Sequence, residues 1–159
     1  MPAETHTVGL ISDTHGLMRS DVHEALAGVE LILHAGDVGG QDILDELALV
    51  APVRAVFGNT DPPDAPGLSA EILITIGGIS IHVSHGHELG SPNPAKLAER
   101  YAADVVVYGH THKQLVTNVG GRLVINPGAA GPRRFNLRPS VGRLTISERK
   151  AEVEIVELT

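Results

Sequence analysis

Side chains that bind metal ions recur along this chain in short glycine-containing motifs. The most distinctive motif is Gly109-His110-Thr111-His112, in which two imidazoles flank a single residue. In chain order, the candidate ligands are Asp13, His15, Asp37, Asn59, His85, His110 and His112. Imidazole, carboxylate and amide groups can together hold two divalent ions in one cleft. The motifs therefore predict a dimetal site, whose usual chemistry is hydrolysis by an activated water molecule.

Each motif taken alone also has an ordinary structural explanation. An Asp-x-His sequence after a strand is often a turn with a surface imidazole, and Asp37 could cap the helix that follows it. Asn59 could form an Asx turn in its proline-rich loop, and Asn126 has the same alternative. Paired histidines around one residue are rarer and favour a metal. The agreement among the motifs supports the metal interpretation.

Composition excludes several other classes of protein. The chain has no cysteine, so any metal must be held by imidazole, carboxylate or amide groups. With 12 basic and 19 acidic residues the formal charge is -7, which repels a nucleic-acid backbone, so a nucleic-acid partner is not expected. No segment has the pattern of a signal sequence or the apolar length of a membrane span, which predicts a cytoplasmic protein. The 159 residues predict a single domain over 1–159.

Apolar periodicity predicts the elements that position these ligands. In the first half, strands are expected at residues 7–12, 30–34 and 53–57. Two amphipathic helices are expected between them, the first capped by Ser20 and the second after Gly39-Gly40. This β-α-β-α-β order is typical of a parallel sheet.

The second half has a different pattern, with strands in pairs around double glycines. Hairpins are expected at residues 71–76 with 79–84 and at 114–119 with 122–126. Between them, Asn93 followed by Pro94 predicts the start of a helix that leads into a strand at 104–108. The last expected strands are 141–147 and 151–158.

The candidate ligands directly follow these expected strands. Open α/β sheets carry their sites at the carboxyl ends of the strands, so loops from one edge are expected to converge on one pocket. His82 lies on the opposite side of its strand from His85, because side chains alternate, and we expect it to be a packed histidine. His34 is expected beside the site without being a ligand.

The ordered motifs resemble those of the calcineurin-like metallophosphoesterases over nearly the whole chain. They are Asp13-x-His15, Gly36-Asp37, Gly58-Asn59-x-Asp61, His85-Gly86-His87 and Gly109-His110-x-His112. The small size and the Asn126-Pro127-Gly128 turn are similar to the small bacterial and archaeal phosphodiesterase branch. The resemblance implies an α/β fold, a four-layer α/β/β/α sandwich with mixed sheets, with the dimetal site at the strand ends.

The resemblance also implies a role for each ligand. One ion would be held by Asp13, His15 and His112, the other by Asn59, His85 and His110, and Asp37 would bridge them. The implied activity is metal-dependent phosphoesterase activity, with phosphodiester hydrolysis favoured and a hydroxide bridging the ions as nucleophile. Manganese is the favoured metal, with iron, nickel and zinc as alternatives. The substrate would be a small phosphate ester, and a homo-oligomer is left open.

Three further positions are candidates for catalysis or substrate binding. His87 could protonate the leaving group beside the catalytic residues Asp37 and Asn59, or it could hold its loop by hydrogen bonding. Arg133 and Arg134 could bind the substrate phosphate, or they could be solvated charges.

The chain also departs from the family pattern at one position. Thr60 stands where most of the superfamily has a histidine, which disfavours monoesters and alkyl esters. The alternative to catalysis is a protein-binding scaffold that resembles the retromer subunit Vps29, with little or no activity.

Overall fold

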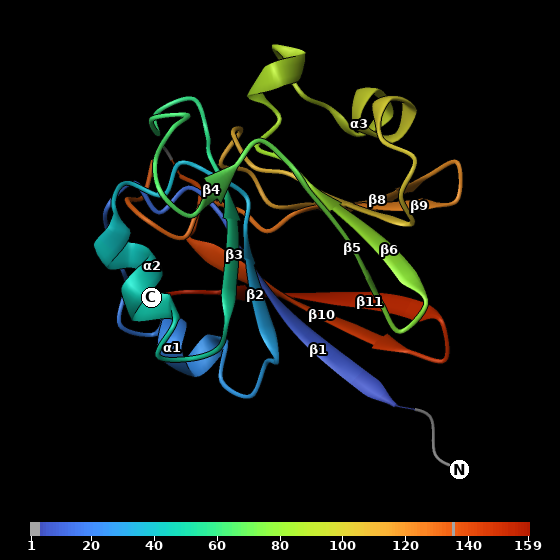
Figure 1. The fold of residues 1–159 in the computed structure, drawn as a ribbon, viewed down its shortest axis with the longest axis horizontal. Helices are drawn as coiled ribbons and strands as arrows, with labels where there is room; N and C mark the ends of the chain where they lie inside the picture. The colour runs from blue at the N-terminus through green and yellow to red at the C-terminus, as the bar shows by residue number, and fades with distance from the viewer. Residues whose placement is uncertain (1–3, 135) are drawn as a thin grey trace.

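The computed structural model describes residues 4–134 and 136–159, which form two mixed β-sheets that face each other with helices outside them (Figure 1). The first sheet has the order β11-β10-β1-β2-β3-β4. Its strands are β1 (Thr5–Ile11), β2 (Leu31–His34), β3 (Val53–Val56), β4 (Leu68–Ser69), β10 (Ser140–Ser147) and β11 (Lys150–Glu157).

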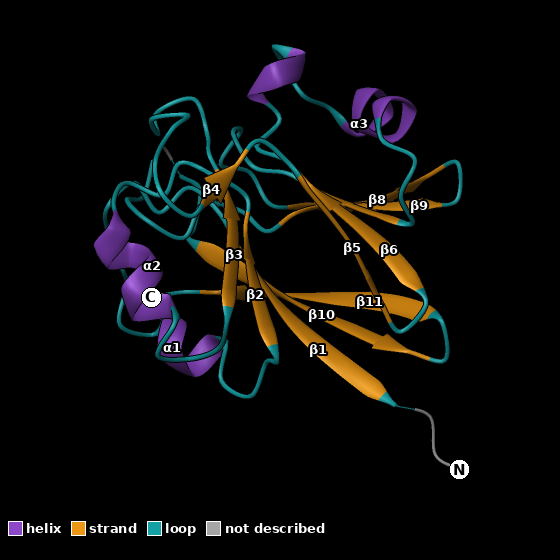
Figure 2. Ribbon diagram, viewed as in Figure 1, coloured by secondary structure: helices purple, strands orange, loops and turns teal. Residues whose placement is uncertain are grey.

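The second sheet has the order β5-β6-β7-β9-β8. Its strands are β5 (Ile72–Ile76), β6 (Ile79–Val83), β7 (Val105–Val107), β8 (Leu115–Val119) and β9 (Arg122–Asn126). Figure 2 shows α1 (Val22–Ala25) and α2 (Gln41–Leu47) beside the first sheet and α3 (Pro94–Arg100) beyond the second. The expected four-layer α/β/β/α arrangement is confirmed.

The β-α-β-α-β pattern predicted for the first half is also confirmed. Strands β1, β2 and β3 pair in parallel, and β10 adds to β1 in the antiparallel sense. The first helix differs from the expectation, because its N-cap is Asp21 instead of Ser20 and it spans four residues. Leu26 and Val29 lie beyond its end and are still buried, so the apolar spacing reflects burial more than helix length.

Both hairpins predicted for the second half are present, as β5 with β6 and β8 with β9. Strand β7 lies between β6 and β9 and is parallel to both. Helix α3 begins as expected, since the Asn93 side chain accepts a hydrogen bond from the backbone N–H of Lys96 at 2.9 Å. The short strand β4 and the 3-10 turn η1 (His87–Leu89) are additional elements that the sequence pattern did not predict.

Three apolar clusters hold the layers together. Val105 and Val107 of β7 point into the core between the sheets, whereas Val106 points to the cluster under α3. This alternation is the reason that the strand is apolar throughout. A third cluster joins α1 and α2 to the first sheet through Leu26, Ile43 and neighbouring side chains. Within the described residues, no helix has the length and apolar character to cross a membrane.

Candidate metal centre

All seven candidate ligands lie together at the carboxyl ends of the strands. A first group surrounds the Oδ1 atom of Asp13, which is 3.3 Å from His112 Nε2 and 3.7 Å from His15 Nε2. The two imidazole nitrogens of His15 and His112 are themselves 3.2 Å apart. The loop after β1 and the loop after β7 thus meet across the two sheets.

A second group surrounds His85, which follows β6. Its Nε2 atom is 3.1 Å from Asn59 Oδ1 and 3.2 Å from Asp37 Oδ2. Asn59 Oδ1 is also 3.1 Å from His110 Nδ1. Asp37 Oδ2 lies 3.6 Å from His15 Nε2 in the first group. Asp37 therefore lies between the groups, where a residue that bridges two ions has to be.

The donor atoms of both groups are arranged as they would be around cations. Ligands at about 2.0–2.2 Å from a metal lie about 3.0–3.5 Å from one another. Asp13 Oδ1 is buried and has no hydrogen-bond partner within the described residues, so a cation would satisfy it. His85 Nδ1 donates to the Ala35 carbonyl at 2.8 Å, which leaves the Nε2 lone pair facing two oxygen acceptors. Divalent ions fit this donor set.

The backbone at the ligands is unusual. Five candidate ligands adopt positive φ angles, which non-glycine residues rarely do: Asp13 (53°), His15 (45°), Asp37 (55°), His110 (70°) and His112 (63°). Among the described non-glycine residues, the others with positive φ are Glu148 and Arg149, in the turn between β10 and β11. Such conformations concentrate at functional sites, because the surrounding structure must hold them against their cost.

Glycines in the motifs make room for the neighbouring ligands. A Cβ atom on Gly36 would lie 2.7 Å from His85 Nδ1. A Cβ atom on Gly58 would collide with the Asp37 carboxylate, and one on Gly109 would collide with the Ser12 hydroxyl. The glycines before Asp37, Asn59 and His110 are therefore required by close approach between loops.

The carboxylates are held in their charged form. Burial would raise the pKa of Asp13, but contacts with His112 and His15 outweigh burial and lower that pKa. Burial would also raise the pKa of Asp37, yet the contact with His85 and the hydrogen bond from the Thr60 backbone N–H lower it to about 2. Burial opposes charge on His85, but Asp37 and Asp13 outweigh it and raise the pKa of this histidine. The site therefore has a negative potential that attracts cations.

Polar neighbours hold the ligands in place, and the sequence patterns did not assign them this role. Ser12 donates to Asp13 Oδ2 at 2.6 Å, and Asn126 Nδ2 donates to the Gly109 carbonyl at 3.1 Å. The Asp61 carboxylate accepts hydrogen bonds from the backbone N–H groups of Val38, Gly39 and Gly58 at 3.0, 3.1 and 3.0 Å. Asp61 thereby joins the two loops that carry Asp37 and Asn59. For Ser12 and Asp61, the available signal was a position within one or two residues of a ligand, and Asn126 had no such signal.

The observed contacts distinguish the metal interpretation from the structural alternatives at Asp37, Asn59 and Asn126. Asp37 does not cap the following helix, because the N-cap of α2 is Gly40, with no side-chain hydrogen bond. Asn59 Oδ1 contacts His85 and His110, as a ligand would. Asn126 does form the turn bond that its alternative predicted, with Gly128 N–H donating at 2.9 Å to its side chain.

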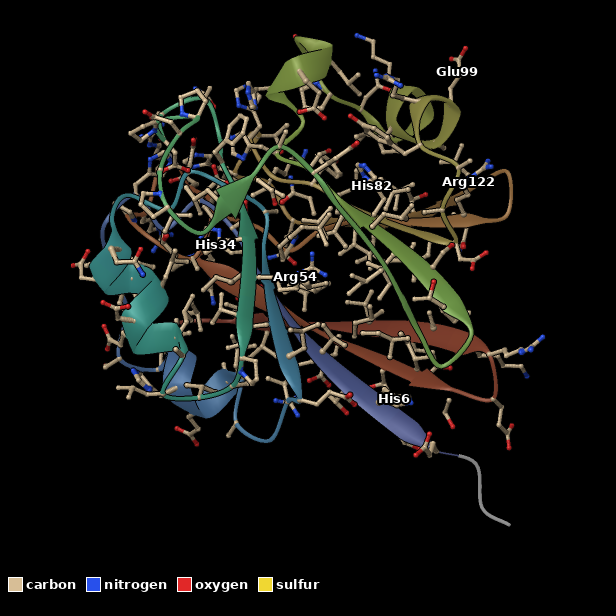
Figure 3. All side chains as sticks on the ribbon, in the orientation of Figure 1. His6, His34, Arg54, His82, Glu99 and Arg122 are labelled. Carbon is tan, nitrogen blue, oxygen red and sulfur yellow. The ribbon has the colours of Figure 1, made fainter. Side chains whose placement is uncertain are left out.

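Two of the histidines that were not proposed as ligands, His82 and His34, lie as expected. His82 stacks on Tyr101 of the α3 segment, with ring centroids 3.8 Å apart, and Figure 3 shows it on the α3 side of the second sheet. His34 is fully buried beside the site, with Nε2 3.0 Å from the Thr14 hydroxyl.

The remaining candidates follow segments that adjoin the centre. The His87 ring is 5.4 Å from the ring of His85 and 6.5 Å from that of His110, measured between centroids. Arg133 and Arg134 are exposed. They follow a loop that is bonded to the site, since Gly131 N–H donates to the Asp13 carbonyl at 3.2 Å. The roles of these three residues stay predictions.

Residues 7–149 match the calcineurin-like phosphoesterase superfamily domain. The chain belongs to this superfamily. It is 35% identical over 159 residues to a probable metallophosphoesterase of Methanothermobacter thermautotrophicus, covering 94% of this chain and 91% of that protein. It is 29% identical over 167 residues to phosphodiesterase MJ0936 of Methanocaldococcus jannaschii, covering 94% and 98%.

The superfamily fold is also that of a solved structure of Vacuolar Protein Sorting 29 from Cryptosporidium parvum. The TM-score is 0.81 at 25% identity, and the match covers 98% of each chain. The resemblance to the metallophosphoesterases and to their small phosphodiesterase branch is thus confirmed. Members of this superfamily use divalent metals, and the Asp and His groups described above are the candidates for holding them.

Proposed function

We propose that this protein is a metal-dependent phosphodiesterase whose two ions are held by Asp13, His15 and His112 and by Asn59, His85 and His110, with Asp37 between them. The observation that carries the proposal is that Asp37 Oδ2 faces both groups, 3.2 Å from His85 Nε2 and 3.6 Å from His15 Nε2. The similarity to phosphodiesterase MJ0936 supports a diester as substrate. Manganese is our first choice of metal, because imidazole with carboxylate and amide oxygens suits it.

The ligand side chains have defined tasks in this reaction. When bound, two divalent ions lower the pKa of a water molecule and neutralise charge on the phosphoryl oxygens. We assign to Asp37 and Asn59 the task of fixing the geometry where the substrate enters, since Asn59 is exposed to solvent and Asp37 is buried. No protein nucleophile is needed, and we assign to His87, whose ring lies 5.4 Å from that of His85, the role of protonating the leaving oxygen of a poorer ester.

The alternative function is a protein-binding scaffold, which the likeness to the Vacuolar Protein Sorting 29 structure supports. The backbone favours the enzyme instead. Five ligand positions adopt left-handed conformations that each cost about 1–3 kcal/mol. A protein that served only as a scaffold would gain nothing from strained backbone at the carboxyl ends of the strands, where the ligands lie. Neither the expected single domain nor the open question of a homo-oligomer distinguishes the enzyme from the protein-binding scaffold.

The proposal is tested by stripping the protein of metal and adding back one ion at a time. We expect hydrolysis of bis(p-nitrophenyl) phosphate to be lost with a chelator and restored by Mn²⁺, with two ions bound per chain. Asp37→Ala should lose hydrolysis and one equivalent of metal. Asp42→Ala is the matched control, because this exposed carboxylate lies in the first turn of α2. Near-full activity of Asp37→Ala at subsaturating Mn²⁺ would contradict the dimetal assignment.

A further inference from the structure

The Asp37 carboxylate uses its two oxygens in different ways. Oδ1 accepts two hydrogen bonds from one residue, at 2.8 Å from the Thr60 hydroxyl and at 2.9 Å from the Thr60 backbone N–H. Oδ2 accepts neither of these bonds and faces the imidazoles of His85 and His15, at 3.2 and 3.6 Å. One residue therefore decides which oxygen is available to the two ligand groups.

The mode of bridging depends on this division. A carboxylate can join two ions through one oxygen or through one oxygen for each ion, and the first mode brings the ions closer together. With Oδ1 occupied by two donors, the first mode is the one that the Asp37 geometry favours. Hydrogen bonds to a charged carboxylate are among the stronger ones, so the hydroxyl of Thr60 makes a real contribution to this preference.

We infer that Thr60 is a positioning residue that directs Asp37 to bridge the two ions through Oδ2 alone. This inference rests on the proposed dimetal function and adds a specific role for the residue that follows Asn59. Thr60 is exposed, so packing does not explain its side chain. Its hydroxyl proton is committed to Asp37, which also makes Thr60 unsuited to protonating a leaving group.

Neighbouring features agree with a role in positioning. The backbone of Asp37 adopts an uncommon left-handed conformation, with φ of 55°. Contacts from neighbouring residues must therefore hold the residue and its carboxylate in place. Gly58 passes so close to Asp37 that a Cβ atom there would collide with Oδ1. The turn of residues 58–60 therefore encloses Oδ1 and leaves Oδ2 toward the imidazoles.

The test replaces the hydroxyl while keeping the shape. Thr60→Val retains the backbone bond and removes the side-chain donor, and Thr60→Ser restores the donor. We expect Thr60→Val to weaken the second Mn²⁺ equivalent about tenfold in calorimetric titration, and Thr60→Ser to bind as the unsubstituted protein does. The electron paramagnetic resonance spectrum of the dimanganese Thr60→Val protein should show a changed exchange coupling. Thr75→Val, an exposed threonine on β5, is the matched control.

Two outcomes separate this inference from the proposed function. If Asp37→Ala loses the second ion while Thr60→Val keeps unchanged affinity and coupling, the role of Thr60 is wrong and the dimetal site stands. If Asp37→Ala binds two ions as tightly as the unsubstituted protein, the dimetal assignment itself fails. Circular dichroism of Thr60→Val and Thr75→Val checks that both variants fold.

Discussion

The two ligand groups of the centre differ in burial and in charge. The buried half consists of Asp13, His15 and His112, and its carboxylate is fully enclosed. The open half consists of Asn59, His85 and His110, in which His85 is buried at the base while Asn59 is exposed. A buried charged ligand holds a cation more firmly than an exposed neutral amide, because water competes less for the ion and the charge is larger. We therefore expect the ion in the buried half to be held more tightly and the substrate to meet the other ion.

Supporting contacts follow the same division. In the buried half, Asp13 Oδ2 is fixed by the Ser12 hydroxyl at 2.6 Å and by the His110 backbone N–H at 3.2 Å. In the open half, the Asn59 side-chain oxygen contacts the imidazoles of His85 and His110, at 3.1 Å from each. The Asp13 carboxylate is therefore held by groups other than the ligand side chains, whereas the Asn59 amide oxygen meets two ligand imidazoles.

The predicted difference in metal affinity between the two halves is tested most directly by removing one ligand from each half. We expect Asp13→Ala to lower Mn²⁺ affinity by more than about 100-fold, since even residues that only support a ligand contribute 10–100-fold. Asn59→Ala should keep one tight equivalent and lose the weaker one. Calorimetric titration of both variants measures this difference. A tight site retained in Asp13→Ala, or the loss of both sites in Asn59→Ala, would reverse the assignment of the halves.

The role of His87 beside the open half is tested through the leaving group. If His87 is the acid, His87→Ala should slow hydrolysis of an alkyl diester by roughly 10²–10⁴-fold, because an alkoxide needs a proton to depart. A p-nitrophenyl diester should be much less affected, since that leaving group is stable without one. Rates on both esters and the metal content are compared. Equal losses on the two esters, or lost metal, would assign His87 to holding its loop.

The rim of the buried half offers a test of substrate binding. Gly131 N–H is bonded to the Asp13 carbonyl, so Arg133 and Arg134 begin close to this half. A side chain that grips the phosphate contributes about 1.5–3 kcal/mol, so the relevant arginine-to-alanine variant should raise KM roughly tenfold or more with kcat maintained. Arg138→Ala, whose side chain pairs with Glu157 at 3.2 Å, is the control. Unchanged kinetics in both single variants would identify two solvated charges.

The smallest effect concerns stability behind the buried half. Burial lowers the pKa of His34 to about 4, from an ordinary value of 6.5. Between these values the unfolded chain binds more protons, so this histidine makes the free energy of unfolding fall as pH drops from 6.5 toward 4. The contribution is up to roughly 3 kcal/mol. Urea unfolding of metal-free protein should show a flatter pH dependence for His34→Gln. Identical slopes of the free energy of unfolding against pH in the unsubstituted protein and in His34→Gln would contradict this contribution of His34.

Much of the fold was predictable because its elements are encoded locally. Strands, hairpins and the start of α3 follow from apolar runs, double glycines and the Asn93-Pro94 pair. The length of α1 was not predictable from spacing alone. Its apolar residues pack on the sheet whether or not the backbone there is helical, so the pattern recorded burial instead of helix length.

The sequence by itself determined which side chains reach the strand ends and that their chemistry suits divalent ions. The family resemblance implied how these ligands divide between two ions. Only the tertiary structure decided how deeply each half is buried and how close its ligands lie, because both depend on the packing of loops far apart in the chain, such as those of His15 and His112. It also decided the left-handed backbone at five ligands, since φ there is imposed by contacts that no local propensity specifies. The bond from Thr60 to Asp37 has the same origin, because a hydroxyl bonds whichever acceptor the folded loops bring to it.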